Sequence, residues 1–395
     1  MTKIKKIGLL CILTLLLGGC WSKHELNELA IAIALGIDKV GDDYEITVQI
    51  VDPSEISVRQ VSAQRSPVVT YHTKEKSIFE ALRKMTTLAA RKPYFSHLQV
   101  VVLGEDLAKE GIQEPLDFIA RDHEFRNDFN VIMSYEATAK EVLNVLTPIE
   151  KVPANKIVNS LRTSEHAWGS IMTITIDELV NTLNNKEKGT VLAAIEIQGD
   201  KKLGMDQTNV QRIQTPVLLR YAGLAVLEEG RFVGLLSEEE SRSIGFLKDS
   251  IHSTAEIIAC PEQGSLSTEI IQSDTKVKGS FERGQPKIAV QIHIIQNVAE
   301  VKCTINLTED TTIQTINQIT AQDIQQQIEQ ALATIQQYYQ VDIVGFSNVL
   351  HRADAKQWKK IKSDWATIFP TLQVDVKVDV QTQGSGTIQN SITNK

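Results

Sequence analysis

Residues 97–103 read His-Leu-Gln-Val-Val-Val-Leu, and this stretch decides how the first half of the chain folds. A nearly continuous apolar run of this length is typical of a strand that is buried on both faces of a sheet. Before it, Ser77 and Glu80 have capping-box spacing, and the apolar stripe that follows predicts an amphipathic helix over residues 77–91. The two segments together predict a mixed sheet with helices packed against it.

Strands and helices alternate on both sides of this stretch. The patterns predict strands at residues 32–38, 44–51, 129–135 and 191–197, and helices at residues 107–111, 115–121, 138–146 and 176–183. A short helix over Leu26–Ala30 is expected to lead into the first of these strands. We therefore assign residues 20–198 to an N-terminal α+β domain.

The second half of the chain has a different pattern. Long alternating runs at residues 255–260, 265–279, 287–296 and 299–307 predict an antiparallel meander. Helices are expected over residues 320–339 and 354–365, and a last strand over 372–380. Trp358 and Trp365 are seven residues apart, which is core spacing on a helix. We assign residues 253–381 to a C-terminal domain of sheet and helices.

Two further segments complete the domain organisation. Residues 199–252 contain a polar loop, a hairpin at 217–236 and a helix that opens at Ser237, and we interpret them as a small middle α+β domain packed on a neighbour. Residues 382–395 are rich in Gly, Ser, Thr and Asn and are expected to form a disordered tail. The fold class is therefore α+β with three domains.

The first 19 residues have the pattern of a secretory signal peptide. Lys3, Lys5 and Lys6 precede an apolar run at residues 7–17. As a helix this run would be about 17 Å long, whereas the hydrocarbon core of a bilayer is about 30 Å thick. The run is therefore too short to remain as a membrane span.

Leu17-Gly18-Gly19-Cys20 ends the apolar run and resembles the lipobox of bacterial lipoproteins. This resemblance implies cleavage before Cys20 and a diacylglyceryl group on its thiol, and two acyl chains attach a protein firmly to a bilayer. The alternative is an ordinary secretory signal followed by an incidental cysteine. We predict Cys20 as the lipid attachment site.

Composition limits the partners of the remaining chain. Without residues 1–19, which contain three lysines and no acidic residue, the chain has 38 basic and 49 acidic residues, a net charge of −11. The negative net charge of this chain does not attract nucleic acid or anionic lipid headgroups. Nucleic acid is thus not predicted as a partner, and membrane attachment is assigned to the lipid.

Four cysteines are too few for a disulfide framework. Cys11 lies in the signal peptide and Cys20 is assigned to lipid, so Cys260 and Cys303 remain. Both lie in strand-like segments, where they either form one bridge within a sheet or stay free and buried. We favour the free thiols.

No motif for catalysis, cofactor binding or metal binding is found. His24-Glu25 and His123-Glu124 begin like a zinc protease motif, but Glu28 and Asn127 replace the second histidine. Residues 121–126 concentrate charge, either as a partner-binding loop, as a paired acid and base, or as a solvated turn with local ion pairs, and we favour the turn. The chain is therefore predicted not to be an enzyme.

Three stretches resemble the C-subunit family of spore nutrient germinant receptors, known as Ger(x)C. The first runs from Gly19-Cys20-Trp21 through Glu25-Leu26 and on through Gly36-Ile37-Asp38. The second comprises Ser77, Glu80-Ala81-Leu82-Arg83, Ser96-His97-Leu98 and Arg121-Asp122. The third comprises Asp342-Ile343-Val344-Gly345-Phe346, Trp358-Lys359, Trp365 and Phe369-Pro370. Ser22 departs from the family, which more often has an acidic residue there. Their order and spacing cover nearly the whole chain after Cys20.

The resemblance implies a lipoprotein on the outer face of the inner spore membrane, with three α+β domains and no catalytic residues. It also implies two partners, the integral membrane A and B subunits of a germinant receptor, which detects nutrients and triggers germination. One alternative is a lipid-anchored solute-binding protein that itself captures the germinant, although the halves of the chain do not read as matched lobes. The least supported alternative is an extracytoplasmic cell-wall hydrolase.

Overall fold

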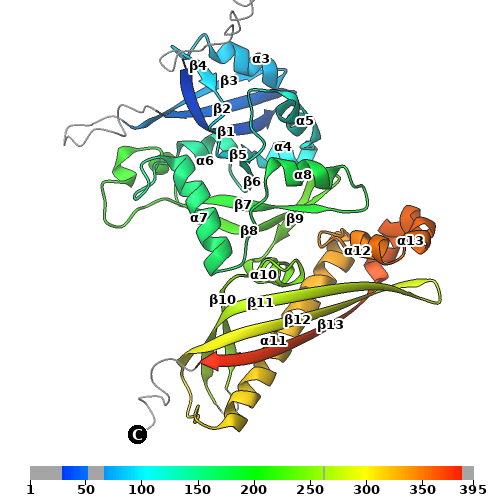
Figure 1. Cartoon of the computed structure of the whole chain (residues 1–395). Helices are drawn as coiled ribbons and strands as arrows, with labels where there is room; N and C mark the ends of the chain where they lie inside the picture. The colour runs from blue at the N-terminus through cyan, green and yellow to red at the C-terminus, as the bar shows by residue number, and fades with distance from the viewer. Residues whose placement is uncertain (1–28, 52–65, 261–262, 385–395) are drawn as a thin grey trace, which may run out of the picture.

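The computed structural model describes residues 29–51, 66–260 and 263–384. It contains two sheets, one in each half of the chain, and Figure 1 shows them stacked one above the other with helices between and around them. This is the mixed α+β architecture that the sequence predicts. The predicted helix over Leu26–Ala30 falls partly outside the described residues, and its last two residues already belong to the first strand.

The first sheet has the strand order β3-β2-β1-β5-β6-β7-β8-β9, with a short β4 paired to β1. Its strands are β1 (Leu29–Val40), β2 (Asp43–Val51), β3 (Val68–Glu75), β4 (Lys92–Tyr94), β5 (Val100–Leu103), β6 (Asn130–Ser134), β7 (Thr190–Gln198), β8 (Leu218–Glu228) and β9 (Arg231–Leu236). The central strands β1, β5, β6 and β7 run parallel, and antiparallel strands flank them on both sides.

Helices cover both faces of this sheet. The core on one face contains residues of α3 (Ile78–Met85), α4 (Glu105–Glu110), α5 (Gln113–Arg121) and α8 (Ile176–Leu183), and the core on the other face contains residues of α6 (Ala139–Asn144) and α7 (Pro153–Ala167). In β5, Val100 and Val102 point into one core while Val101 and Leu103 point into the other. The apolar run is thus buried on both faces, as predicted.

The hairpin of the predicted middle domain belongs to the first sheet. β8 pairs with β7 from Leu218 to Leu227, and β9 closes the sheet at its edge. Short α9 (Lys201–Gly204) and η2 (Gln207–Asn209) lie in the segment before β8, and α10 (Glu238–Leu247) follows β9. A hairpin has too little apolar surface for a core of its own, so it adds to an existing sheet. The described residues therefore form two sheets, whereas the sequence analysis divided the chain into three α+β domains.

The second sheet has the order β10-β11-β12-β13. Its elements are β10 (Thr254–Ala259), β11 (Ser265–Glu282), β12 (Gln285–Val301), α11 (Asp310–Ala333), η3 (Thr334–Tyr339), α12 (Phe346–Ala353), α13 (Ala355–Ile361), η4 (Lys362–Asp364), α14 (Trp365–Ile368), η5 (Phe369–Thr371) and β13 (Gln373–Gly384). The first three strands form the predicted antiparallel meander, whereas β13 runs parallel to β12 because the helices carry the chain back across the sheet.

Several element predictions were wrong. The fourth meander strand predicted at residues 299–307 does not form, because β12 ends at Val301 and α11 begins at Asp310, ten residues before its predicted start. The helix predicted over 77–91 ends at Met85, where the hydroxyls of Thr86 and Thr87 bond to the carbonyls of the last turn. Helices α7 and α12 were not predicted.

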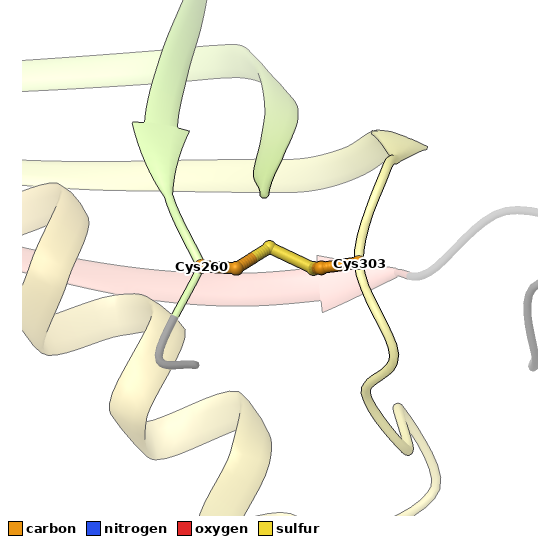
Figure 2. The surroundings of a disulfide bond; sticks show 2 residues. All are labelled: Cys260 and Cys303. Atoms are coloured by element: carbon orange, nitrogen blue, oxygen red, sulfur yellow. A yellow bond between two sulfur atoms is a disulfide. The ribbon is translucent and has the colours of Figure 1, made fainter. Parts of the chain in front are cut away.

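Cys260 and Cys303 form a disulfide, so the favoured interpretation of two free thiols was wrong (Figure 2). β10 and β12 both pair with the start of β11, where Leu266 lies between Ile258 and Val301. Each cysteine lies two residues beyond these partners, and their Cα atoms are 6.5 Å apart. The bridge within one sheet was the alternative left open by the sequence, and strand pairing across β11 decides for it.

Candidate functional site

The predicted lipid attachment site, Cys20, lies outside the described residues. The first described element after it is β1, which begins at Leu29, where it pairs with β4. Among the described helices, none combines the length and apolar composition needed to cross a bilayer. The described residues therefore show where the chain enters the folded body, and the site itself stays a prediction.

Asp38, in the first stretch of the family resemblance, binds the start of a helix. Its carboxylate accepts hydrogen bonds from the backbone N–H groups of Ala139 and Lys140 at 2.7 and 2.9 Å. Gly104 lies so close that a Cβ there would overlap Asp38. Burial raises the pKa of Asp38 to about 6, although the two backbone hydrogen bonds act in the opposite direction. This acid therefore fixes α6 against β1.

Asp342, in the third stretch of the family resemblance, also accepts backbone hydrogen bonds at the start of a helix. Its side chain accepts from the backbone N–H groups of Gly345, Phe346 and Ser347 at 2.7 to 3.0 Å, at the start of α12. Gly345 has φ of +92°, a conformation that favours glycine. Burial raises the pKa of Asp342 against the effect of these bonds. An aspartate buried at a helix start is a structural cap.

The segment around Asp342 also connects the two sheets. The backbone N–H of Gly189, next to β7, bonds to the Asp342 carbonyl at 3.1 Å. Lys248 Nζ donates to the carbonyl of Ile343 at 3.3 Å, and burial lowers the pKa of Lys248 to about 8. A single apolar core runs from one face of the first sheet into the second sheet. The two halves are therefore packed as one body.

Several other residues of the resemblance are also structural. Trp358 and Trp365 are buried, with ring centroids 5.1 Å apart, which confirms their predicted core spacing. Asp122 Oδ1 accepts from the backbone N–H of Glu124 in a turn, and His123 beside it is exposed. Arg121 forms an exposed ion pair with Asp117. The cluster at residues 121–126 is thus the solvated turn that the sequence analysis favoured.

A polar pocket of about 540 Å³ lies beside the first sheet. Its walls come from the segment before β5, from the start of β6 and from one side of α7, so it opens near the amino ends of two parallel strands. The residues in its wall that carry amide or charged side chains are Gln99, Arg126, Asp128, Asn130, Asn155, Asn159 and Arg162. Sequence reasoning missed this pocket because its residues come from four separate segments and α7 was not predicted.

The most buried polar residue in the wall of this pocket is Asn130. It is only 5% exposed, and its side-chain amide has no hydrogen-bond partner among the described residues. Its amide atoms are not among the enclosed side-chain atoms that lack a partner, so they face the pocket, where water or a ligand can reach them. At the rim Arg126 pairs with Asp128 at 2.8 Å, while Arg162 forms no ion pair with a described residue. A guanidinium without an ion pair and an amide in the same pocket are groups that suit a small polar molecule with a carboxylate.

The described residues contain no group of three His, Cys, Asp or Glu side chains arranged to bind a metal ion. The most buried ion pair joins Arg242 of α10 to Glu256 of β10, with 3.0 Å between Nε and Oε1. Burial raises the pKa of Glu256, which Arg242 opposes. Arg242 also lies 5.5 Å from the ring centroid of Trp168. The ion pair between Arg242 and Glu256 therefore links α10 to β10.

Comparison with known proteins gives matches along both halves of the chain. Residues 22–197 match the family model described as spore germination protein N-terminal domain, and residues 222–386 match the model described as spore germination B3/GerAC like, C-terminal. Two relatives from Bacillus subtilis (strain 168) are spore germination protein KC, 29% identical over 97% of this chain and 96% of the relative, and spore germination protein B3, 23% identical over 96% and 97%.

A solved structure has the same fold. The crystal structure of the GerBC protein matches with a TM-score of 0.58 and 18% identity, covering 88% of this chain and 96% of that chain. Because the two family models together extend from residue 22 to residue 386, the match includes both sheets and the junction between them. The chain belongs to the Ger(x)C family, the C-subunit family of spore nutrient germinant receptors.

Proposed function

We propose that this chain is the lipid-anchored C subunit of a nutrient germinant receptor, acting with two integral membrane subunits on the outer face of the inner spore membrane. The observation that carries the proposal is the match of both halves of the chain to spore germination proteins over nearly their full length. The family resemblance in the sequence begins at Gly19-Cys20-Trp21, so the predicted acylated cysteine lies two residues before the matched N-terminal model.

The proposed role is structural and regulatory, without catalysis by this chain. The buried acids Asp38 and Asp342 each accept backbone hydrogen bonds at the start of a helix, which occupies their carboxylate oxygens. A catalytic acid or base has to reach a substrate from a cleft. The groups that most resemble reactive carboxylates thus support the fold, and the surface is left for contacts with partners.

The direct test is deletion of the gene in its sporulating host. Loss of germination with one class of nutrient, with normal sporulation and normal nutrient-independent germination, is the expected result. Reintroducing the wild-type gene should restore the response, which controls for effects on neighbouring genes. Normal germination with every nutrient tried would contradict the proposal.

A second candidate function is capture of a small solute, and the unpartnered amide of Asn130 in the polar pocket favours it. Arg162 offers a guanidinium for a carboxylate, as in the binding of an amino acid. Against it, the two sheets differ in strand order and connection, so the halves are not the matched lobes of a solute-binding protein. Calorimetry with amino acids should give micromolar binding that Asn130→Leu abolishes if this function is real; no binding would exclude it.

A further inference from the structure

The surface of α3 and the turn after it has the opposite charge to the rest of the chain. Residues 74–92 contain six basic and two acidic residues, a net charge of +4, whereas the whole chain has a net charge of −8. We call residues 74–92 the α3 surface. The basic residues are Lys74, Lys76, Arg83, Lys84, Arg91 and Lys92. A concentration of positive charge on an acidic protein marks a place where an anionic partner can bind.

Two large apolar side chains are exposed on the same surface. Phe79 is 51% exposed and Leu88 is 57% exposed. The Arg83 guanidinium lies 5.0 Å from the centroid of the Phe79 ring, so the apolar and the basic groups are adjacent. Exposed aromatic and aliphatic side chains next to Arg and Lys are typical of helices that lie in the interface of an anionic bilayer.

Ion pairs leave part of this charge free. Lys84 pairs with Glu75, Lys92 pairs with Glu124, and Lys74 pairs with Asp43. In contrast, Lys76, Arg83 and Arg91 form no ion pair with any residue that the structure describes. Glu80 of α3 also forms no ion pair with a described residue, so a net of two uncompensated positive charges remains on the α3 surface.

The α3 surface lies where the chain enters the folded body. The turn after α3 leads into β4, and β4 pairs with the first residues of β1, Lys92 with Leu29. In Figure 1, α3 and β4 lie at the end of the molecule opposite the second sheet. Leu29 is nine residues after Cys20, which an extended chain spans in about 30 Å at most. A lipid on Cys20 would hold this end of the protein near the bilayer.

We infer that the α3 surface docks on the anionic headgroups of the bilayer and sets the orientation of the anchored protein. This inference rests on the proposed lipid anchor at Cys20. The two acyl chains supply the attachment, and the basic and apolar side chains of α3 select which end of the body faces the lipid. The second sheet then points away from the membrane, where it is free to contact other proteins.

The test uses the mature chain with Cys20→Ser, so that binding through the surface is measured without acyl chains. Co-sedimentation with vesicles of equal phosphatidylglycerol and phosphatidylcholine should show binding that weakens at high salt, and pure phosphatidylcholine should give little. The double variant Arg83→Glu, Arg91→Glu should bind at least about 25-fold more weakly, because each basic residue near such a surface contributes about fivefold. Leu88→Ser should weaken binding by a smaller factor.

The matched control is Lys278→Glu with Lys377→Glu, which makes the same charge change on exposed positions of β11 and β13 in the second sheet. It should bind these vesicles at least about ten times more tightly than the α3 double variant. The inference is overturned if the two double variants bind equally or if the Cys20→Ser chain ignores anionic vesicles, and a protein partner for α3 would then be favoured. Loss of the acylated wild-type chain from membrane fractions would instead contradict the anchor, so the two failures are distinguishable.

Discussion

The two sheets of this protein are buried to different degrees. In the first sheet, all four residues of β5 are fully buried, because helices cover both faces. In the second sheet, β12 alternates: Val290 is 1% exposed while its neighbour Gln291 is exposed. The covered face packs on α11 and its neighbours, and the other face is polar. The first sheet is therefore buried on both faces, whereas the second sheet is buried on one face and exposed on the other.

The largest difference between the two regions should come from the disulfide. Replacing Cys260 and Cys303 by serine opens a loop of 43 residues and should lower the free energy of unfolding by about 4 kcal/mol. The loss should concentrate in the second sheet, so hydrogen exchange of β10–β12 should accelerate more than that of β5 and β6. Equal acceleration in both sheets would show that the bridge does not act locally.

The next effect concerns pH. Because burial raises the pKa of Asp38 from 3.8 to about 6, the folded state binds more protons than the unfolded state between these values. Asp38 therefore adds to the free energy of unfolding at low pH. This contribution of about 3 kcal/mol is lost as the pH rises from about 4 to about 6. Urea denaturation across this range should show the decline.

Asp38→Asn should flatten this pH dependence. The matched control is Asp274→Asn on the open face of the second sheet, where the carboxylate is exposed. The control should keep the wild-type slope. An identical slope for Asp38→Asn and wild type would contradict the assignment, although Asp342 and Glu256, whose pKa values are also raised by burial, should leave a residual slope in every variant.

Neighbouring residues in a strand should respond differently in the two sheets. Val101→Ala and Val102→Ala in β5 should each lower the free energy of unfolding by about 2 kcal/mol, because both side chains are fully buried. In β12, Val290→Ala should cost about 2 kcal/mol and Gln291→Ala less than about 0.5 kcal/mol. Chemical denaturation measures all four. A large difference between the losses caused by Val101→Ala and Val102→Ala would contradict the burial of β5 on both faces.

The smallest effect probes the contact between the two regions. Tyr339 donates a hydrogen bond from its hydroxyl to the carbonyl of Leu235 in β9 at 3.0 Å. Tyr339→Phe should cost about 1 kcal/mol. Tyr338→Phe is the control, since Tyr338 is 79% exposed and should change stability by less than about 0.5 kcal/mol. Equal effects of the two changes would argue against the junction described here.

Local patterns in the sequence predicted most elements of both sheets. The Val-Val-Val-Leu run gave a strand buried on both faces, and alternation gave the meander β10–β12. Capping at Ser77 and Ser237 predicted where α3 and α10 begin. These features depend on residues close in the sequence, so they are readable without a structure.

Features that depend on distant contacts were missed. The pairing of β7 with β8, which joins the hairpin to the first sheet, and the disulfide both depend on strand order, which local patterns do not specify. Helix α7 has apolar residues at helical spacing, Ala154, Ile157, Val158 and Leu161, so its signal was available. The polar pocket was not foreseeable, because Asn130 and Arg162 line one pocket only once α7 packs against β5.

The central proposal is that acyl chains on Cys20 attach this chain to the inner spore membrane as a receptor subunit. The most direct measurement compares wild-type and Cys20→Ala chains, expressed in the deletion host, for their share of the protein in spore membrane fractions and for nutrient germination. The proposal predicts that wild type is in the membrane fraction and restores germination, while Cys20→Ala is depleted from it and germinates poorly. Equal membrane recovery and equal germination of the two chains would contradict it.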